Sequence, residues 1–502
     1  MNLIFDRKFI LILIFMLAMQ NCGKNNTEQA QLLTPFHAGY GYIHSGTSSV
    51  AGAVGSAELD DPIALQVDAN GKQVVAGTSK NQAGGTELTL WRYNSDGSVD
   101  STFGSGGSTH HGATGIASAT GASTNDSPTQ LRIDHLGRYV VIGISTNPSG
   151  GGEFYFARYL PSGALDTSFN GTGFSHFGPT GMSGAAGSST YDYLTDLRED
   201  SSGRYVACGV SYTAAGGGQL AIVRYTANGT LDLGFNGVGY VLGSTTDAAG
   251  GSGSGKYDVG SFLQIDSSGK YIITGETVGT TGFELAIWRY TSAGALDTSF
   301  GSGAGFVIGG TTAASGRTAN IFDTPAGMQI DSLGRYVVAG STTTPSGGIE
   351  PVIWRYNSDG SLDSSFGNSG IILFGATGIS GVSGAAENDS ISGMVIDSAG
   401  RYVLADTSTN SAHGMQIALI RYLPSGALDT AFGSGSGFVT FGNTGAAGGT
   451  GAGESDSGSY NGANSVLLDR EGRYLLFAPS KNTAGGVELA IWRYLPSGFL
   501  DR

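Results

Sequence analysis

The chain has 502 residues, and its 40 acidic residues outnumber its 25 basic residues to give a formal net charge of -15. Surfaces that bind nucleic acid are rich in Lys and Arg, because they must neutralise phosphates. The acidic balance and the absence of a basic stripe therefore exclude a nucleic-acid-binding protein.

The N-terminal segment 1–21 is typical of a secretory signal. Arg7 and Lys8 precede an apolar run from Phe9 to Ala18, which is too short to span a bilayer. Cys22 follows at the place where the signals of bacterial lipoproteins put the acylated residue. The box before it, 19–21, departs from the common lipoprotein form.

Residues 22–34 are polar and predict a tether behind a lipidated Cys22. No Asp follows the cysteine directly. By resemblance to lipoproteins of bacteria with two membranes, this favours a lipid anchor in the outer membrane of the cell envelope. Cys208 is the other cysteine of the chain, and we expect a buried small side chain there, with no internal disulfide.

An Arg-Tyr dipeptide recurs seven times after the tether, at intervals of 66, 66, 65, 66, 66 and 72 residues. A period this regular predicts one supersecondary unit copied in series. A basic residue also follows the glycine of one turn in every unit, so fourteen of the basic residues belong to the repeat. These turn residues are Lys72, Arg138, Arg204, Lys270, Arg335, Arg401 and Arg473.

Residues 389–442 serve as the type unit, which predicts four short strands. They are expected at 389–397, 401–405, 417–422 and 437–442. Turns are expected at 397–400 and 424–426, and a polar loop at 408–414, because Asp, Pro and Gly favour tight turns. Four antiparallel strands per unit describe one blade of a β-propeller. The sequence therefore predicts an all-β, seven-bladed propeller.

Three motifs of the unit resemble the delta-60 repeat, a bacterial family expected to form propellers. They are the D-x-x-G-[RK] turn, the [AV]-x-x-[AVIW]-R-Y strand and the G-x-[LV]-D-x-x-F-[GN] segment. The resemblance covers nearly all of residues 36–502 and implies a fold rather than a function. The spacers between units are longer here than in the usual family pattern.

The seventh unit stops at Arg502, before its Phe and its fourth strand. Residues 35–46 read like residues 431–442 and would supply the missing strand. We therefore expect an N-terminal strand to complete the C-terminal blade, which removes the free sheet edges of an open ring. Residues 35–502 would then form a single propeller domain, expected to be a monomer.

The Arg of each Arg-Tyr lies eight residues before an Asp, and a turn between them could bring the two side chains together. Seven copies of an active site would be unusual, whereas seven structural ion pairs are expected where a charge lies between blades. The predicted pairs are Arg92 with Asp100, Arg158 with Asp166, Arg224 with Asp232, Arg289 with Asp297, Arg355 with Asp363, Arg421 with Asp429, and Arg493 with Asp501.

Seven further polar residues stand eight positions before each turn Asp, at the start of the innermost strands. They are Asp60, Asp126, Asp192, Asp258, Asp323, Asp389 and Asn461. One interpretation is a ring at the mouth of the central channel that binds Ca²⁺ or an amine-bearing ligand. The structural interpretation, which we favour, is that each carboxylate caps the backbone of its own spacer or of a neighbouring blade.

His44, His110 and His176 share one position on three successive fourth strands. Fourth strands lie apart on the rim, so we expect surface histidines and no zinc site. No nucleophile elbow, phosphate loop or cysteine cluster occurs in the chain. The spacers are expected on the face opposite the short turns, where long loops of a rigid scaffold would bind ligands.

Three functions stay open. The favoured one is a membrane-anchored, non-enzymatic binding or interaction module of the cell envelope, with a protein or glycan ligand and no cofactor. The second is an envelope hydrolase or lyase that acts on glycans at the channel mouth. The third is a purely structural envelope protein, and the fold alone cannot choose among them.

Overall fold

The computed structural model describes residues 42–44, 60–111, 115–118, 125–177, 182, 192–214, 216–243, 248, 257–279, 282–309, 321–345, 347–374, 389–409, 415–440, 466–481 and 487–502. These residues belong to one compact unit, Phe36–Arg502. The signal, the tether, Cys22 and the long spacers lie outside the described residues. No helix among the described residues is long and apolar enough to cross a membrane.

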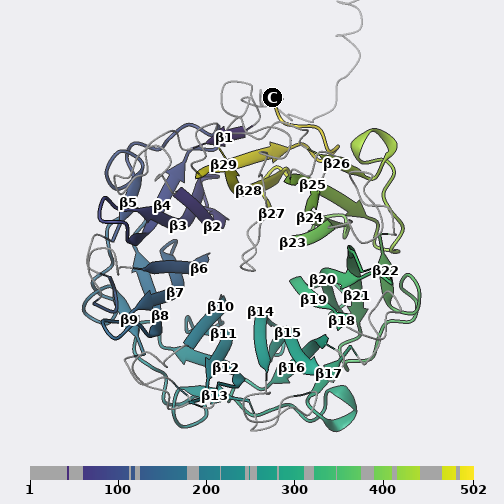
Figure 1. Ribbon diagram of the computed structural model, residues 1–502, viewed down its shortest axis with the longest axis horizontal. Coiled ribbons are helices and arrows are strands. Elements are labelled where there is room, and N and C mark those ends of the chain that lie inside the picture. Colours follow the sequence, from purple (N-terminus) through teal and green to yellow (C-terminus); the bar gives the residue numbers. More distant parts are fainter. Residues whose placement is uncertain are drawn as a thin grey trace, which may run out of the picture. The chain divides into compact units, whose positions relative to one another are not determined.

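Seven antiparallel sheets stand around a common axis, as Figure 1 shows. The fold is therefore a seven-bladed β-propeller, as predicted. Blade 1 consists of β2 (Asp60–Val67), β3 (Gln73–Lys80), β4 (Thr86–Tyr93) and β5 (Ser108–His110). Blade 2 consists of β6 (Asp126–Ile133), β7 (Tyr139–Thr146), β8 (Gly152–Tyr159) and β9 (Phe174–His176).

The next three blades repeat this order. Blade 3 contains β10 (Asp192–Glu199), β11 (Tyr205–Tyr212), β12 (Gly218–Tyr225) and β13 (Tyr240–Leu242). Blade 4 contains β14 (Asp258–Ile265), β15 (Tyr271–Gly279), β16 (Gly282–Tyr290) and β17 (Phe306–Ile308), and β18 (Ile321–Phe322) adds a parallel strand beside β16. Blade 5 contains β19 (Thr324–Ile330), β20 (Tyr336–Thr343), β21 (Ile349–Tyr356) and β22 (Ile371–Leu373).

Blade 6 contains β23 (Asp389–Ile396), β24 (Tyr402–Thr409), β25 (Met415–Tyr422) and β26 (Phe438–Thr440). Blade 7 contains β27 (Val466–Leu468), β28 (Tyr474–Lys481) and β29 (Val487–Tyr494), and β1 (Tyr42–His44) is its outermost strand. Two 3₁₀ turns, Gly301–Gly303 and Gly433–Gly435, precede β17 and β26.

The ring is completed by its N-terminal strand. β1 pairs antiparallel with β29, and Tyr42 lies opposite Trp492. The prediction that residues near the N-terminus supply the fourth strand of the last blade is confirmed. The outer edge of β29 is thereby paired, and the last blade has the four strands that the seventh unit alone cannot provide.

The expected bounds of the second and third strands were too narrow. In blade 6 the hairpin continues into the predicted polar loop, where Ser408 pairs with Gln416 and Thr409 pairs with Met415. Thr407 and Ser408 are polar but buried. The backbone ladder therefore extends beyond the apolar residues, because hydroxyl side chains can be buried when their hydrogen bonds are satisfied.

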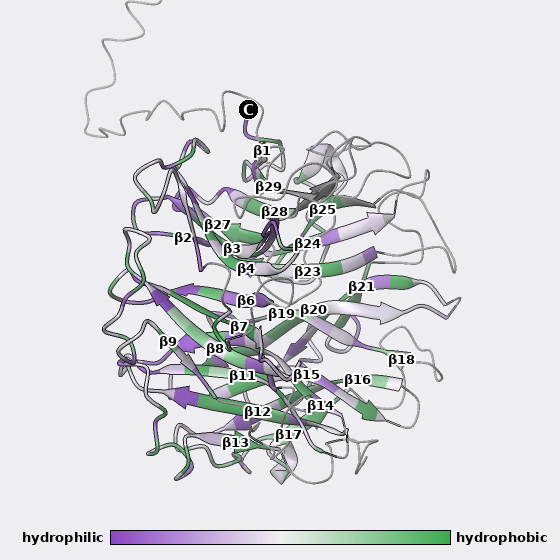
Figure 2. Ribbon diagram, turned by 60° about the vertical axis from the view of Figure 1, so that its left-hand side comes forward, coloured by the Kyte–Doolittle hydropathy of each residue, from purple (hydrophilic) through white to green (hydrophobic). Residues whose placement is uncertain are grey.

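Each junction between neighbouring blades has its own hydrophobic cluster. The cluster between blades 1 and 2 includes Val74, Leu90 and Tyr139, and the one between blades 7 and 1 includes Val75, Trp91 and Phe477. Figure 2 shows hydrophobic residues along the strands and hydrophilic residues at several strand ends, for example on β12. Apolar packing between sheets therefore positions the polar groups that lie at the ends of the strands.

Candidate functional site

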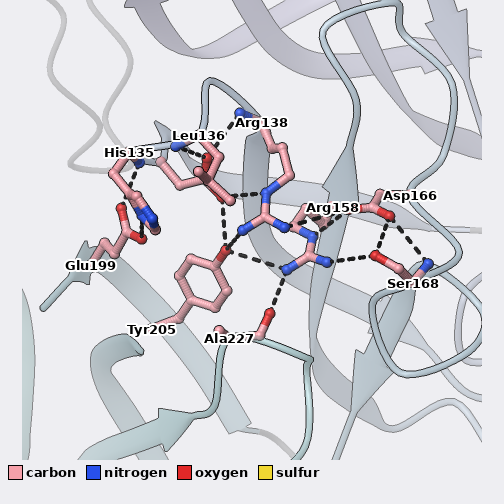
Figure 3. Close-up of polar contacts among 10 residues, drawn as sticks. His135, Leu136, Arg138, Arg158, Asp166, Ser168, Glu199, Tyr205 and Ala227 are labelled. Carbon is pink, nitrogen blue, oxygen red and sulfur yellow. Dashed lines mark hydrogen bonds and ion pairs between the residues drawn. The ribbon is translucent and has the colours of Figure 1, made fainter. Parts of the chain in front are cut away.

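Each Arg-Tyr arginine joins its own blade to the next one. Its Nε lies 2.6–2.8 Å from Oδ2 of the Asp eight residues later, in all seven units. In the junction of blades 2 and 3, Arg158 also reaches Tyr205 Oη at 3.4 Å and the carbonyl of Ala227 at 2.5 Å (Figure 3). We call this contact set the inter-blade latch. The pairs that we expected to be structural thus lie where they connect blades.

The latch also includes an aromatic contact and spans the closing junction. In blades 1 to 6 the guanidinium carbon lies 4.0–4.7 Å from the ring centroid of the Phe eleven residues later. In blade 7, Arg493 donates to the carbonyl of Ser95 in blade 1 at 2.5 Å. The ion pair and the contact with a carbonyl of the next blade therefore recur at all seven junctions, whereas the tyrosine and phenylalanine contacts are found at six of them among the described residues.

A second contact reinforces five of the junctions. The basic residue after the turn glycine is an arginine there, and it bonds the turn aspartate as well as approaching the latch. Arg138 Nε lies 2.7 Å from Asp134 Oδ2, and its Nη1 lies 3.8 Å from Asp166 Oδ2. Tyr205 Oη donates to the same Asp134 oxygen at 2.9 Å. The planar fork of arginine can serve two carboxylates at once, so Arg138 contacts both aspartates of this junction.

Lysine replaces this arginine in blades 1 and 4 and changes the junction. Lys270 Nζ lies 2.7 Å from Asp297 Oδ2 in the latch. Asp266 Oδ1 accepts bonds from the backbone N–H groups of Ser268 and Lys270, at 2.9 Å each. Among the described residues, no donor bonds Asp266 Oδ2, and no hydrogen bond joins it to Tyr336. Among the described residues the Lys270 ammonium meets Asp297 and not Asp266, so the second oxygen of Asp266 stays open.

A cavity of about 670 Å³ occupies this junction of blades 4 and 5. Asp266, Lys270, Asp331, Tyr336 and Asp359 line it together with five serines. A second cavity of about 520 Å³ adjoins it toward the rim and shares Ser299 and Asp359 with it. We call the two together the blade 4/5 groove.

The charges of the groove are mixed and partly compensated. Burial opposes ionisation of Asp297, but the hydrogen bonds from Lys270 and Ser299 hold its pKa well below the ordinary value. Hydrogen bonds from Ser361 lower the pKa of Asp359, and Asp331 Oδ2 accepts a bond from Arg335 at 2.7 Å. Burial raises the pKa of Tyr336, so its hydroxyl stays protonated. The groove therefore offers ionised acceptors, an ammonium and a neutral hydroxyl.

The acidic residues that we considered as a channel-mouth ring are buried where the structure describes them. Asp126 Oδ1 accepts bonds from Ser145 Oγ at 2.5 Å and from the Ile116 backbone N–H at 3.1 Å. The remaining ring residues that the structure describes, Asp60, Asp192, Asp258, Asp323 and Asp389, are at most 3% exposed. Asn461 lies outside the described residues. Burial raises the pKa of Asp126 to about 6, although the Ser145 bond opposes this shift.

These carboxylates hold the chain ahead of their strands. Asp192 accepts a bond from the backbone N–H of Met182, and Asp258 accepts one from that of Ala248, each ten residues earlier. This is the geometry of the capping interpretation. Within the described part of the chain, no group of three or more His, Cys, Asp or Glu side chains is arranged to hold a metal ion.

The histidines have buried partners that the sequence reasoning missed. His110 Nδ1 lies 2.7 Å from Glu87 Oε2, and His176 Nδ1 lies 3.0 Å from Glu153 Oε2. Both glutamates are at most 3% exposed. Glu87 and Glu153 are each the second residue of a third strand, β4 and β8. This shared position was the feature of the sequence that could have revealed the two His–Glu pairs. His44 lies in β1, and its side chain is outside the described set.

Cys208 and Asp406 are examples of buried groups outside the latch and the groove. Cys208 is fully buried, and burial raises the pKa of its thiol to about 12, which makes it unreactive at neutral pH. Asp406 is 1% exposed, and neither carboxyl oxygen meets a donor among the described residues. It occupies the position of Gly77 in blade 1, where an added Cβ would lie 2.2 Å from the carbonyl oxygen of Asp61.

Five segments of the chain match a family described as "Domain of unknown function (DUF5122) beta-propeller". They are residues 69–103, 137–169, 201–235, 267–300 and 334–366. Each begins after the turn aspartate and covers the second and third strands and the latch Arg, Asp and Phe of blades 1 to 5. The chain carries β-propeller repeats similar to this family. No curated protein shows a significant match.

Solved structures share the general fold at low similarity. A Dyadobacter fermentans protein of unknown function is 12% identical with a TM-score of 0.39, over 75% of this chain and 98% of that one. An ulvan lyase of polysaccharide lyase family PL25 is 11% identical with a TM-score of 0.49, over 90% and 97%. A Trypanosoma rangeli sialidase is 9% identical with a TM-score of 0.35, over 91% and 60%. At these values the likeness gives no argument about function.

Proposed function

We propose that the protein is an exported, lipid-anchored binding module of the bacterial envelope and that its blade 4/5 groove binds a polyhydroxylated ligand, namely a glycan. The observation that carries the proposal is the open carboxylate oxygen of Asp266 beside the Tyr336 hydroxyl in a cavity of about 670 Å³. Cys22 would carry the lipid, and residues 22–34 would tether a delta-60 type propeller to the outer membrane.

The chemistry of the lining favours a hydroxyl-rich ligand. Ligand sites usually measure roughly 300–1,000 Å³, so the cavity has room for a sugar. An apolar ligand would strip water from Asp266 without replacing its hydrogen bonds, which is unfavourable. Sugar hydroxyls can donate to Asp266 Oδ2 and accept from Tyr336 and the serines. Bonds to an ionised acceptor are stronger than bonds between neutral groups.

The state of the groove carboxylates favours binding over glycan cleavage. A general acid needs a pKa near the working pH, which requires a raised carboxyl pKa. The pKa of Asp359, which lines the groove, and that of Asp297 in the adjoining latch are both lowered. These two carboxylates are therefore suited to accept hydrogen bonds and unsuited to deliver protons.

The test is a glycan array that is probed with the full-length protein in mild detergent. It compares the parent protein with the Lys270→Arg variant. An arginine at 270 should bond Asp266, as Arg335 bonds Asp331, and its larger side chain should occupy part of the cavity. We expect the variant to lose binding at least tenfold, because a hydrogen bond to a charged group contributes about 1.5–3 kcal/mol. Lys80→Arg, at the end of β3, is the matched control. Equal binding by parent and Lys270→Arg would contradict the proposal.

A further inference from the structure

We propose that the junction of blades 1 and 2 holds a second copy of the glycan site, so that one propeller binds a repeating glycan through two sites. This inference rests on the proposed function of the blade 4/5 groove. It starts from the turn lysine, which blades 1 and 4 alone carry among the seven units.

The polar geometry of the blade 4/5 groove recurs around Lys72. Lys72 Nζ lies 2.6 Å from Asp100 Oδ2 in the latch. Asp68 Oδ1 accepts bonds from the backbone N–H groups of Asn70 at 2.7 Å and Lys72 at 3.0 Å. Among the described residues, no donor bonds Asp68 Oδ2. The carboxylate oxygen that arginine covers elsewhere is thus open at this junction as well.

A cavity also recurs at the equivalent place on the rim. An open cavity of about 700 Å³ is lined by residues that include Thr102, Gly104, Ser162 and Gly163, and Asp68 and Lys72 are not among its lining residues. Their counterparts in the other junction, Ser299, Gly301, Asp359 and Gly360, line the cavity of about 520 Å³. Both lysine junctions therefore have an open turn carboxylate and a rim cavity, and in the blade 4/5 groove the carboxylate also lines a cavity that adjoins the rim cavity.

The two sites differ in their rim residues, which predicts related but unequal ligand preferences. Ser162 stands where the other site has Asp359, and His110 stands where the other has Ile308. Glu87 holds His110 through Nδ1, while the histidine side chain remains 43% exposed. The second site is thus less acidic and has an oriented imidazole beside its serine and threonine hydroxyls.

The positions of the sites determine what can use both. The junctions are three blades apart in a ring of seven, so they lie on opposite sides of the axis. A single sugar can occupy only one of them. A glycan chain or a surface that repeats the sugar can occupy both, and the second binding event is then intramolecular, which slows dissociation.

The test uses methyl glycosides of glucose, galactose, mannose, rhamnose, fucose and N-acetylglucosamine. Titration calorimetry measures the stoichiometry of the full-length parent, Lys72→Arg, Lys270→Arg and the double variant. We expect two sites in the parent, one in each single variant and none in the double variant. The binding sugar is then immobilised at high and low density on a sensor surface. On the dense surface the parent should dissociate at least tenfold more slowly than either single variant.

The outcomes separate the inference from the function on which it rests. A parent stoichiometry of one, unchanged by Lys72→Arg and abolished by Lys270→Arg, overturns the second site and leaves the blade 4/5 groove intact. Failure of every glycoside to bind the parent counts against the proposed function itself. Equal dissociation of parent and single variants from the dense surface overturns two-site binding.

Discussion

The latch arginine of blade 2 offers the sharpest test of the fold, through the substitution Asp166→Ala. Arg158 has a side chain only 2% exposed, and its Nε lies 2.7 Å from Asp166 Oδ2. Removing Asp166 leaves a buried guanidinium without its carboxylate. Breaking a buried ion pair from one side costs about 3–5 kcal/mol.

The remaining contacts of Arg158 place the expected loss at the lower end of this range. The guanidinium keeps the Ala227 carbonyl, Ser168 Oγ at 3.1 Å and the ring of Phe169 at 4.7 Å. Ser168 itself loses its 2.6 Å bond to Asp166 Oδ1. We therefore expect the free energy of unfolding to fall by about 3 kcal/mol.

The assay is urea unfolding followed by circular dichroism, with His135→Ala as the control in the same junction. His135 bonds Glu199, as Figure 3 shows, but its side chain is 60% exposed. An exposed pair contributes about 0–1 kcal/mol, so the control should barely shift the midpoint. If Asp166→Ala unfolds at the same urea concentration as His135→Ala, the latch does not hold the blades as described.

The effect of Asp166→Ala should also depend on pH. Although burial opposes ionisation, the bonds from Ser168 and Arg158 lower the pKa of Asp166 in the folded state. The folded protein then binds that proton more weakly than the unfolded chain. Ionised Asp166 therefore stabilises the fold above the pKa of an ordinary aspartate, and this stabilisation is lost as the pH falls. The difference between parent and variant should shrink in acid.

Three further predictions follow from single features. Asp406→Gly should stabilise the fold by about 1 kcal/mol at neutral pH. The substitution removes a buried group without hydrogen bonds, which costs about 1–3 kcal/mol, while the greater backbone freedom of glycine in the unfolded chain offsets about 0.5–1 kcal/mol of this gain. Burial raises the pKa of Asp406, so the folded state holds its proton more tightly than the unfolded chain does. The gain in urea midpoint on substitution should therefore grow as the pH rises from 4 to 7. A gain that does not depend on pH would refute this. Deleting residues 34–46 removes β1 and should cause aggregation or a much lower melting temperature, and unchanged melting would refute its role in closing the ring. Cys22→Ser should move the protein from the detergent phase to the aqueous phase, and unchanged partitioning would exclude the lipid anchor.

The architecture could be predicted because the same strand and turn motifs recur in all seven repeat units. The Arg-Tyr period, the turn glycines and the strand near Tyr42 each depend on contacts that every blade repeats. The end of β24 at Thr409 could not be predicted in the same way. Polar residues such as Ser408 are buried there by hydrogen bonding to Asp389, and a contact nineteen residues away is invisible in a hydrophobic pattern.

The candidate site was overlooked because it lies in a difference between blades. Lys270 and Arg335 both occupy the basic position of the D-x-x-G-[RK] turn, and from the sequence alone they were treated as equivalent. Their side chains differ in reach. The Arg335 guanidinium bonds Asp331 at 2.7 Å and Asp363 at 3.2 Å, whereas the Lys270 ammonium bonds Asp297 and not Asp266 among the described residues. The open oxygen and the cavity follow from that difference, which becomes visible only once the neighbouring blade is in place.

The central claim, that lysine opens a junction which arginine fills, can be tested directly by carboxylate labelling with a carbodiimide and glycine ethyl ester, followed by peptide mass spectrometry. The parent should label Asp266 much faster than Asp331. Lys270→Arg should slow labelling at Asp266 alone, and Arg335→Lys should accelerate it at Asp331. Equal rates at the two aspartates in the parent, or rates that neither substitution changes, would contradict the account.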